Sequence, residues 1–299
     1  MATPDSGVCG IALLDKPLGL SSHQATQRVR RLFAVDKAGH IGSLDPLASG
    51  MLPVCLGEAT KVAGVVVDGL KQYTFRIALG GRTATGDAEG PVVESCAVPA
   101  ITPADLDQVL AAFVGELEQV PPMYSALKRD GRPLYQLARA GIEVDRPARR
   151  IFIQSLSGRV LGADLLECCV RCGKGTYVRV LAEDIARALG TCGHVVLLRR
   201  DWVEPFQARQ MLTLLQLEQL PRGELGTVLL AADQALPALP QIVLEGEEAR
   251  RVQSGQRAFH AGMPAGLVRL YGPAGRFLGL GQGDGADGVR AKRLFVSAL

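Results

Sequence analysis

The stretch GHIGSLDPLASG, residues 39–50, constrains the backbone more than any other part of the chain. Pro46 fixes its own φ and disfavours the helical conformation at the preceding residue, so Asp45 is expected on an extended or turning backbone. A close approach of the backbone to another molecule is permitted by three glycines, Gly39, Gly42 and Gly50. A single aspartate held in this way suits a nucleophile or a base better than a metal site, which needs several ligands. An Asp-Pro turn has the same pattern, so both interpretations stay open at this point.

The chain is long enough and apolar enough for one large folded domain and a smaller one. It has 299 residues, of which 47% are hydrophobic and 21% charged, as is typical of globular proteins. The net charge of +3 gives no general argument for a nucleic-acid partner. Basic residues cluster locally at Arg146, Arg149 and Arg150, and again at Arg199 and Arg200. Such clusters can converge into a phosphate-binding surface, although each alone is more typical of a solvated face.

Seven cysteines, an odd number without regular spacing, do not indicate a secreted disulfide framework. Cys168, Cys169 and Cys172 form a C-C-x-x-C run, with Cys192 and His194 further on, so these residues are candidate zinc ligands. Zinc usually requires two well-spaced ligand pairs. On a strand, Cys168 and Cys172 would instead share one face with the valine between them, as small core residues do. The spacing favours core cysteines, and no metal is predicted.

Several familiar motifs are absent or stand in the wrong context. Residues 281–286 fit G-x-G-x-x-G/A in form, but no helical pattern follows them, which excludes a dinucleotide site. The sequence has neither a Walker A motif nor a G-x-S-x-G elbow. No signal sequence opens the chain and no apolar run reaches membrane-spanning length. We therefore expect a cytoplasmic protein that does not enter a membrane.

Hydrophobic periodicity predicts an alternation of strands and helices. The strands are expected over residues 11–14, 73–79, 165–172, 267–271, 276–280 and 294–296. The helices are expected after a capping box at Ser21 and Gln24, over 58–67, over 104–113 with Thr102 as N-cap, and over 181–189. The expected irregular segments are a glycine-rich loop at 80–90, a proline-punctuated surface excursion at 120–150 and a linker at 235–240.

Two further segments supply candidate helpers for Asp45. Residues 176–180 are expected to be extended, which would place Tyr177 and Arg179 on one face. An arginine beside a carboxylate keeps it ionised and orients it through a charge-assisted pair. Taken alone, Arg179 is more typical of a surface arginine. Tyr73 shares one face of its expected strand with Phe75 and Ile77, a pattern typical of a core aromatic.

Seven sequence blocks occur in a fixed order along the first 205 residues. They are LLDKP (13–17) followed by Gly19, Ser21 and Ser22; the segment 38–61, which begins AGH; KQY (71–73); RTATGDA (82–88); PPMYSALK (121–128); KGTYVR (174–179); and HVVLLRR (194–200). Together they resemble the TruB family of tRNA pseudouridine synthases, which act on uridine 55 in the TΨC loop. The C-terminal sixty residues resemble, more weakly, the small RNA-binding PUA-type module of that family.

The resemblance implies roles for individual residues. Asp45 would be the catalytic aspartate, with Arg179 paired to it and Tyr73 stacked on the target base. The nucleotide pocket would be lined or supported by His40, Tyr177, Leu198 and Lys16. Ile41 and Ser43 stand where relatives often carry Thr and Ala, beside the aspartate rather than in its place.

The resemblance also implies an α+β pseudouridine-synthase fold, with a mixed, largely antiparallel central sheet flanked by helices. The catalytic domain would span residues 1–235, including an RNA-contacting excursion near 120–150, and a β-rich PUA-like domain would span 236–299. The expected partner is the T-arm stem-loop of tRNA, bound by a monomer without an obligatory protein partner. Because the reaction has no redox or hydrolytic step, neither a cofactor nor a metal is expected.

The mechanism and some rival functions stay open. Asp45 would either attack C1′ of the flipped nucleotide or remove a sugar proton. Tyr73, or a water relayed by it, would help remove the C5 proton. One rival is an RNA-binding or tRNA-folding protein with little or no catalysis; another is a relative that works in a guide-RNA complex, although the long basic tails of that branch are lacking. A small-molecule glycosidase would need a second carboxylate, for which Asp87 is the loop candidate.

Overall fold

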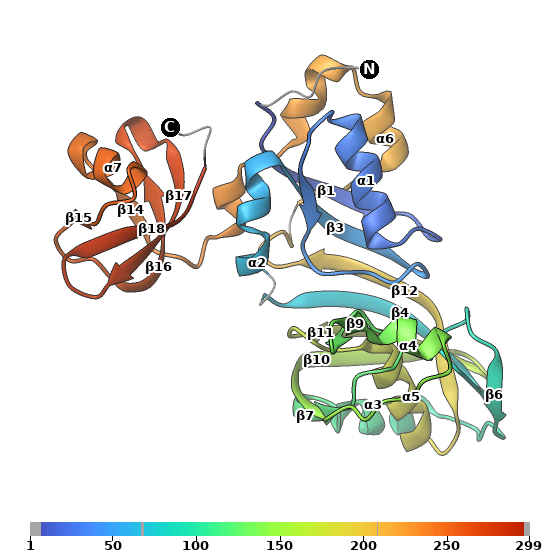
Figure 1. Ribbon diagram of the computed structural model, residues 1–299. Helices are drawn as coiled ribbons and strands as arrows, with labels where there is room; N and C mark the ends of the chain where they lie inside the picture. Colours follow the sequence, from blue (N-terminus) through green and yellow to red (C-terminus); the bar gives the residue numbers. More distant parts are fainter. Residues whose placement is uncertain (1–6, 67–68, 208, 296–299) are drawn as a thin grey trace.

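The computed structural model describes residues 7–66, 69–207 and 209–295. Its centre is a nine-stranded sheet in the order β13-β1-β3-β12-β4-β11-β10-β7, with β2 paired to β3 (Figure 1). The strands are β1 (Gly10–Lys16), β2 (Ala38–His40), β3 (Ala48–Leu56), β4 (Lys71–Leu79), β7 (Gly115–Gln119), β10 (Arg149–Gly162), β11 (Leu165–Cys172), β12 (Gly193–Val203) and β13 (Leu212–Thr213). β1 and β13 run parallel, as do β3 and β12, and the other pairs are antiparallel. The expected mixed, largely antiparallel sheet is confirmed.

Helices pack on one face of this sheet. They are α1 (Ser22–Leu32), α3 (Pro103–Ala111), α5 (Val178–Ala188) and α6 (Leu214–Gln219). α1 and α6 pack near β1, β2 and β3, whereas α3 and α5 pack on β10, β4 and β12. Val29 of α1, Leu106 of α3 and Ile185 of α5 belong to one continuous apolar cluster with the sheet. The beginnings of α1 and α5 therefore lie over the same face of the central strands.

A second sheet lies toward the C-terminus, beside the central sheet (Figure 1). It has the order β14-β16-β17-β18-β15, and its strands are β14 (Gln241–Val243), β15 (Ala258–Phe259), β16 (Ala265–Tyr271), β17 (Phe277–Asp284) and β18 (Gly288–Leu294), with α7 (Gly246–Gln253) packed on it. Its buried residues, such as Leu244 and Val252, continue into a cluster with Ile11 and Leu13 of β1. Because β1 is buried on both faces, residues 11–14 read as an unbroken apolar run. The expected small β-rich C-terminal unit is confirmed.

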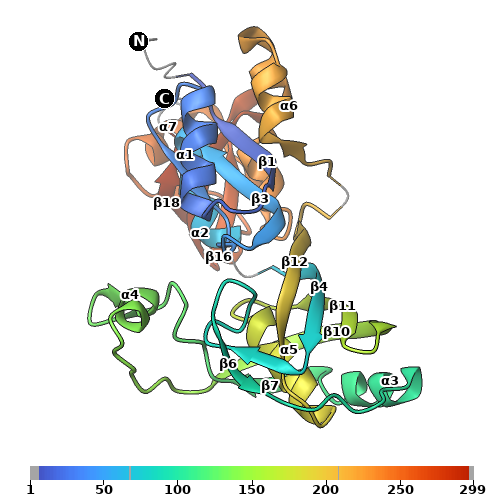
Figure 2. The same ribbon diagram turned by 90° about the vertical axis from the view of Figure 1, so that its right-hand side faces the viewer.

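Short elements fill the connections. They are η1 (Gly57–Lys61), α2 (Ala63–Val66), β5 (Gly81–Thr83), β6 (Val92–Ser95), β8 (Lys128–Arg129), β9 (Arg132–Pro133), α4 (Leu134–Arg139), η2 (Arg222–Val228), η3 (Ala232–Ala235) and η4 (Pro273–Gly275). α4 and the segment around it project away from the central sheet (Figure 2). Most residues between 128 and 150 are exposed, which confirms a surface excursion in this part of the chain.

Most predicted elements occur, with three corrections. The helix expected over 58–67 is the 3-10 turn η1 followed by the single turn α2, and Val67 lies outside the described residues. The last predicted strand, 294–296, is misplaced: β18 runs from Gly288 to Leu294, and Val296 lies outside the described residues. Residues 176–180 are not extended throughout, because α5 already begins at Val178.

Candidate active site

The loop that carries Asp45 lies between β2 and β3 and is pinned at its base. The hydroxyl of Ser22, the first residue of α1, accepts a hydrogen bond from the Leu44 N–H across 2.7 Å and donates to the Leu44 carbonyl oxygen across 2.9 Å. The Ala48 N–H donates to the Asp45 carbonyl oxygen across 3.0 Å, which closes a turn around Pro46. The Asp-Pro turn therefore exists, and the Asp45 side chain on it is accessible from outside. Ser22 is a positioning residue that the sequence analysis did not single out.

Arg179, in the first turn of α5, orients the Asp45 carboxylate. Its Nε lies 2.9 Å from Asp45 Oδ2, and its terminal nitrogens donate to the carbonyl oxygens of Thr85 (2.6 Å) and Tyr124 (2.7 Å). The side chain of Arg179 is 5% exposed and that of Asp45 42%, so a fixed cation meets a carboxylate that is reachable from outside. Desolvation raises the pKa of the Asp45 carboxyl above its ordinary value, while the guanidinium opposes that shift.

A second carboxylate, Asp87, lies behind Arg179. Asp87 Oδ2 is 3.7 Å from Arg179 Nε, and Asp87 Oδ1 accepts hydrogen bonds from the Thr85 hydroxyl (2.6 Å) and the Glu89 N–H (3.1 Å). Because Asp87 is buried at 3% exposure, it can fix Arg179 but cannot reach a substrate. Asp87 is therefore not the second substrate-flanking carboxylate that a glycosidase requires.

Strand register aligns four residues in a row beneath the Asp45 loop. Lys16 of β1 is paired with Gly50 of β3. Gly50 is in turn paired with Arg200 of β12, and Arg200 with Tyr73 of β4. Directly paired residues point to the same face of a sheet, here the face over which α1 and α5 begin. Since Lys16 is 0% and Arg200 1% exposed, two cations are buried below one reachable carboxylate.

Lys16 supports the Asp45 turn from behind. Its Nζ donates to the carbonyl oxygens of Leu20 (2.6 Å) and Pro17 (2.9 Å), and lies 3.5 Å from that of Pro46. Burial lowers the pKa of Lys16 to about 8. The turn therefore depends on an ammonium group that loses its proton more easily than an ordinary lysine.

Arg199 and Arg200 do not form a common basic surface, contrary to the sequence-based interpretation. Arg199 points away from the Arg200 face and makes a two-pronged pair with Asp15, at 3.0 and 2.8 Å. Arg200 points inward, where its Nε donates to the Met51 carbonyl oxygen across 2.7 Å. Alternation along β12 separates the two side chains. Residues two apart on a strand share a face, so the apolar Leu198 in HVVLLRR could have indicated that Arg200 also points inward.

Two glycines around Asp45 make room for this arginine. A Cβ on Gly50, where φ is +100°, would lie 2.2 Å from the Arg200 carbonyl oxygen. A Cβ on Gly42, where φ is +67°, would lie 3.1 Å from a guanidinium nitrogen of Arg200. At Gly39 the nearest contact would be an ordinary 3.8 Å. At Gly50 the expected approach of another molecule is wrong, because the missing Cβ makes room for the backbone of Arg200, whereas at Gly42 the nearest neighbour is the end of the Arg200 side chain.

The remaining site residues surround Asp45 unequally. Tyr73 and Leu198 lie on the core face at 9% and 5% exposure. The charge of Asp45 acts on the phenol groups of both Tyr73 and Tyr177, so both lie near the acid. His40 in β2 lies by contrast near Arg200 and His23. Burial lowers the His40 pKa, and its Nδ1 is buried with no hydrogen-bond partner in the described part of the chain.

Tyr177 and Arg179 do not share a strand face as expected. Tyr177 is the residue before α5, and Arg179 lies in the helix. The backbone of Tyr177 is held by the side chain of Gln119 in β7, which accepts from its N–H across 2.8 Å and donates to its carbonyl oxygen across 3.2 Å. A residue distant in sequence thus fixes the backbone where α5 begins, and no local sequence pattern indicates it.

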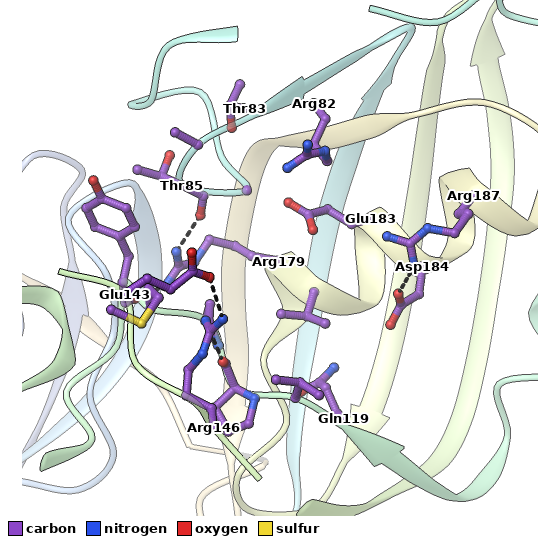
Figure 3. Close-up of a pocket in the computed structure, with 18 of the residues that line it drawn as sticks. Arg82, Thr83, Thr85, Gln119, Glu143, Arg146, Arg179, Glu183, Asp184 and Arg187 are labelled. Carbon is purple, nitrogen blue, oxygen red and sulfur yellow. Dashed lines mark hydrogen bonds and ion pairs between the residues drawn. The ribbon is translucent and has the colours of Figure 1, made fainter. Parts of the chain in front are cut away.

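A cavity of about 530 Å³ adjoins Arg179 (Figure 3). It is lined by residues of the 82–86 loop, the 118–124 segment and α5, and it carries charges of both signs. Arg146 on its wall donates to the Pro121 carbonyl oxygen across 3.2 Å and lies 3.4 Å from Glu143. Of the arginines expected on a phosphate-binding surface, Arg146 is therefore committed to the protein, whereas Arg149 and Arg150 are exposed at the start of β10.

The cysteines are structural. Cys168 and Cys172 lie on the buried face of β11 at 1% and 0% exposure, which confirms their prediction as core residues. Cys192 forms a disulfide with Cys96, 96 positions away, a pair that no sequence spacing indicated. Within residues 7–66, 69–207 and 209–295, His, Cys, Asp and Glu side chains form no group of three suited to a metal ion.

Family models match consecutive parts of the chain. Residues 30–178 match the TruB family pseudouridylate synthase N-terminal domain, residues 179–237 the tRNA pseudouridylate synthase B C-terminal domain, and residues 240–295 the Pseudouridine synthase II TruB C-terminal domain. The chain belongs to the TruB family. It is therefore a pseudouridine synthase, an isomerase.

Curated TruB relatives are similar along nearly the whole chain. The tRNA pseudouridine synthase B of Aromatoleum aromaticum (strain DSM 19018 / LMG 30748 / EbN1) is 48% identical over 287 residues, which cover 96% of this chain and 92% of the relative. That of Xanthomonas axonopodis pv. citri (strain 306) is 46% identical over 288 residues, which cover 96% and 94%. A chain in the crystal structure of a Cbf5-Nop10-Gar1 complex has the same fold, with a TM-score of 0.73 at 24% identity over 96% of this chain and 85% of that one. No helix in the described part of this TruB chain is long and apolar enough to cross a membrane.

Proposed function

We propose that this protein isomerises uridine 55 in the TΨC loop of tRNA to pseudouridine, with Asp45 as the catalytic carboxylate. The observation that carries the proposal is a single reachable carboxylate held 2.9 Å from the fixed guanidinium of Arg179. The relatives at 46% and 48% identity are named tRNA pseudouridine synthase B, which supports tRNA as the substrate.

The uridine first leaves its base stack, which costs a few kcal/mol and favours a loop over a duplex. The N1–C1′ bond then breaks, the uracil rotates, and a C5–C1′ bond forms. C5 gives up a proton and N1 gains one, so the overall change is an isomerisation. Asp45 either attacks C1′ or removes a sugar proton. Both routes require an ionised carboxylate with a fixed direction, which Arg179 supplies.

The residues around Asp45 hold the flipped nucleotide. Tyr73 stacks on the uracil, and its hydroxyl or a relayed water helps to remove the C5 proton. The pocket is completed by Tyr177, His40 and Leu198, with Lys16 supporting the turn of Asp45 from behind. None of these steps calls for a cofactor or a metal.

The remainder of the protein binds the T-arm. The exposed side chains of Arg149 and Arg150 contact phosphates, beside the excursion near 120–150. Residues 236–299 act as a PUA-like RNA-binding domain next to the catalytic domain, 1–235. The protein works as a cytoplasmic monomer and needs no protein partner.

The test uses an unmodified T-arm hairpin and a carbodiimide readout, because the isomerisation does not change the mass. Wild type is compared with Asp45→Asn and with a matched control, Asp107→Asn, whose carboxylate is exposed on α3. Wild type and Asp107→Asn are expected to form pseudouridine, whereas Asp45→Asn binds the hairpin with unchanged affinity and forms none. Turnover by Asp45→Asn would refute the assignment. A wild type that binds and refolds tRNA without forming pseudouridine would favour the RNA-folding alternative.

A further inference from the structure

Among the described residues, Arg200 is one of the largest side chains that are fully buried, with 1% of its surface exposed. No carboxylate in the described part of the chain lies within ion-pair distance of its guanidinium. A buried charge without a counter-ion is costly unless its hydrogen bonds are satisfied. The partners of Arg200 therefore indicate what this charge contributes.

Its partners lie on both sides of Asp45 in the chain. A terminal nitrogen of Arg200 donates to the carbonyl oxygens of Gly42 (3.1 Å) and Ile41 (3.4 Å), and its Nε donates to that of Met51 (2.7 Å). One planar guanidinium thus ties the segment that enters the catalytic loop to the strand that leaves it. The glycines that flank Asp45 leave the space that this arrangement needs.

Arg200 is also directly opposite Tyr73 in the sheet, and its charge acts on the Tyr73 phenol. Because arginine has only donors, the phenol oxygen is the part of the Tyr73 hydroxyl that the guanidinium can attract. Asp45 acts electrostatically on the same phenol, so Tyr73 lies near Asp45.

We propose that Arg200 is a positioning residue for uridine isomerisation, which fixes the Asp45 loop and the Tyr73 side chain relative to each other. The inference rests on the proposed function. Lysine at this position would keep the charge but lose the planar fork that reaches the three carbonyl oxygens. An apolar side chain would fill the space and satisfy none of them.

The test compares Arg200→Lys with wild type and with Arg199→Lys, a neighbouring substitution in a half-exposed ion pair on the other face. Single-turnover rates on the T-arm hairpin are measured separately from hairpin affinity. Arg200→Lys should lower the rate at least about ten-fold at unchanged affinity, because small displacements of reacting groups are costly. Arg199→Lys should behave as wild type, and melting curves establish that each variant is folded.

A double-mutant cycle tests the link to Tyr73. Arg200→Lys should cost less rate in a Tyr73→Phe background than alone, since the hydroxyl that it positions is then missing. An Arg200→Lys rate equal to wild type, or an equal cost in both backgrounds, would overturn the inference. If Arg200→Lys does not fold, Arg200→Gln takes its place in the same cycle, and an equal cost in both backgrounds again overturns the inference. A wild type that forms no pseudouridine would instead refute the proposed function itself.

Discussion

Arg179 approaches Asp45 through its Nε at 2.9 Å while both of its terminal nitrogens are committed to backbone carbonyl oxygens. The guanidinium is thereby fixed by two loops before it meets the carboxylate. A surface arginine would be free to follow the acid, whereas this one defines where the acid points. The direction of Asp45 is thus built into the packing of α5 against the segments that contain Thr85 and Tyr124.

Removing this cation should therefore affect chemistry more than binding. Arg179→Ala is expected to lower the single-turnover rate at least about 100-fold, because Asp45 loses its direction and a displacement of about 1 Å can cost that much. Arg187→Ala is the matched control, since Arg187 lies on the same helix in an exposed pair with Asp184. Both variants are assayed on the T-arm hairpin. Unchanged kinetics for Arg179→Ala would mean that the pair has no catalytic part.

Asp87 should act through Arg179. Asp87→Asn keeps the size of the side chain but removes the charge that lies 3.7 Å from Arg179 Nε. The rate is expected to fall between about ten- and 100-fold, less than for Arg179→Ala, because the two backbone anchors remain. In Arg179→Ala, the additional substitution of Asp87 should cost little. A full separate cost in that background would show that Asp87 acts independently.

The rate should fall on the acid side as Asp45 takes up a proton. The ionised carboxylate is the active form in both proposed routes, and its pKa is raised by desolvation. The decline with falling pH should therefore begin at a higher pH than for an ordinary aspartate. A single-turnover pH–rate profile measures this limb. A rate that stays constant down to the ordinary aspartate range would contradict the raised pKa.

The rate should also fall on the alkaline side as pH rises through about 8, the lowered pKa of Lys16. Below that pH the ammonium group braces the carbonyl oxygens of Pro17 and Leu20; above it the amine has one donor fewer. Lys16→Met should be slower at neutral pH and should lack this limb. If Lys16→Met showed the same fall in rate at alkaline pH, that fall would be due to the titration of another group.

Local sequence predicts those elements whose determinants are local. Ser21 and Gln24 form the expected capping box before α1, and Thr102 caps α3 by accepting from the Asp105 N–H. The alternation over residues 165–172 gives β11 with its predicted bounds. In each case the signal and the structure lie within a few residues of each other.

The sequence does not predict features that depend on contacts between distant segments. The start of α5 was missed because Gln119, from β7, holds the backbone of Tyr177. The burial of Arg200 depends on the register that places it between Gly50 and Tyr73. The family resemblance supplied the candidate residues, whereas their convergence on Asp45 required the packing of α5 against the sheet.

The last prediction concerns the proposed RNA-binding surface, where Arg149 and Arg150 are exposed and Arg146 is bonded within the protein. Each phosphate contact releases condensed counterions, so affinity for the hairpin should fall as salt rises. Replacing Arg149 and Arg150 by glutamine should reduce the slope of log affinity against log salt by about 1 to 2. Arg146→Gln should leave the slope unchanged, because Arg146 is bonded to Pro121 and Glu143. Equal slopes for the double variant and wild type would place the phosphate contacts elsewhere on the protein.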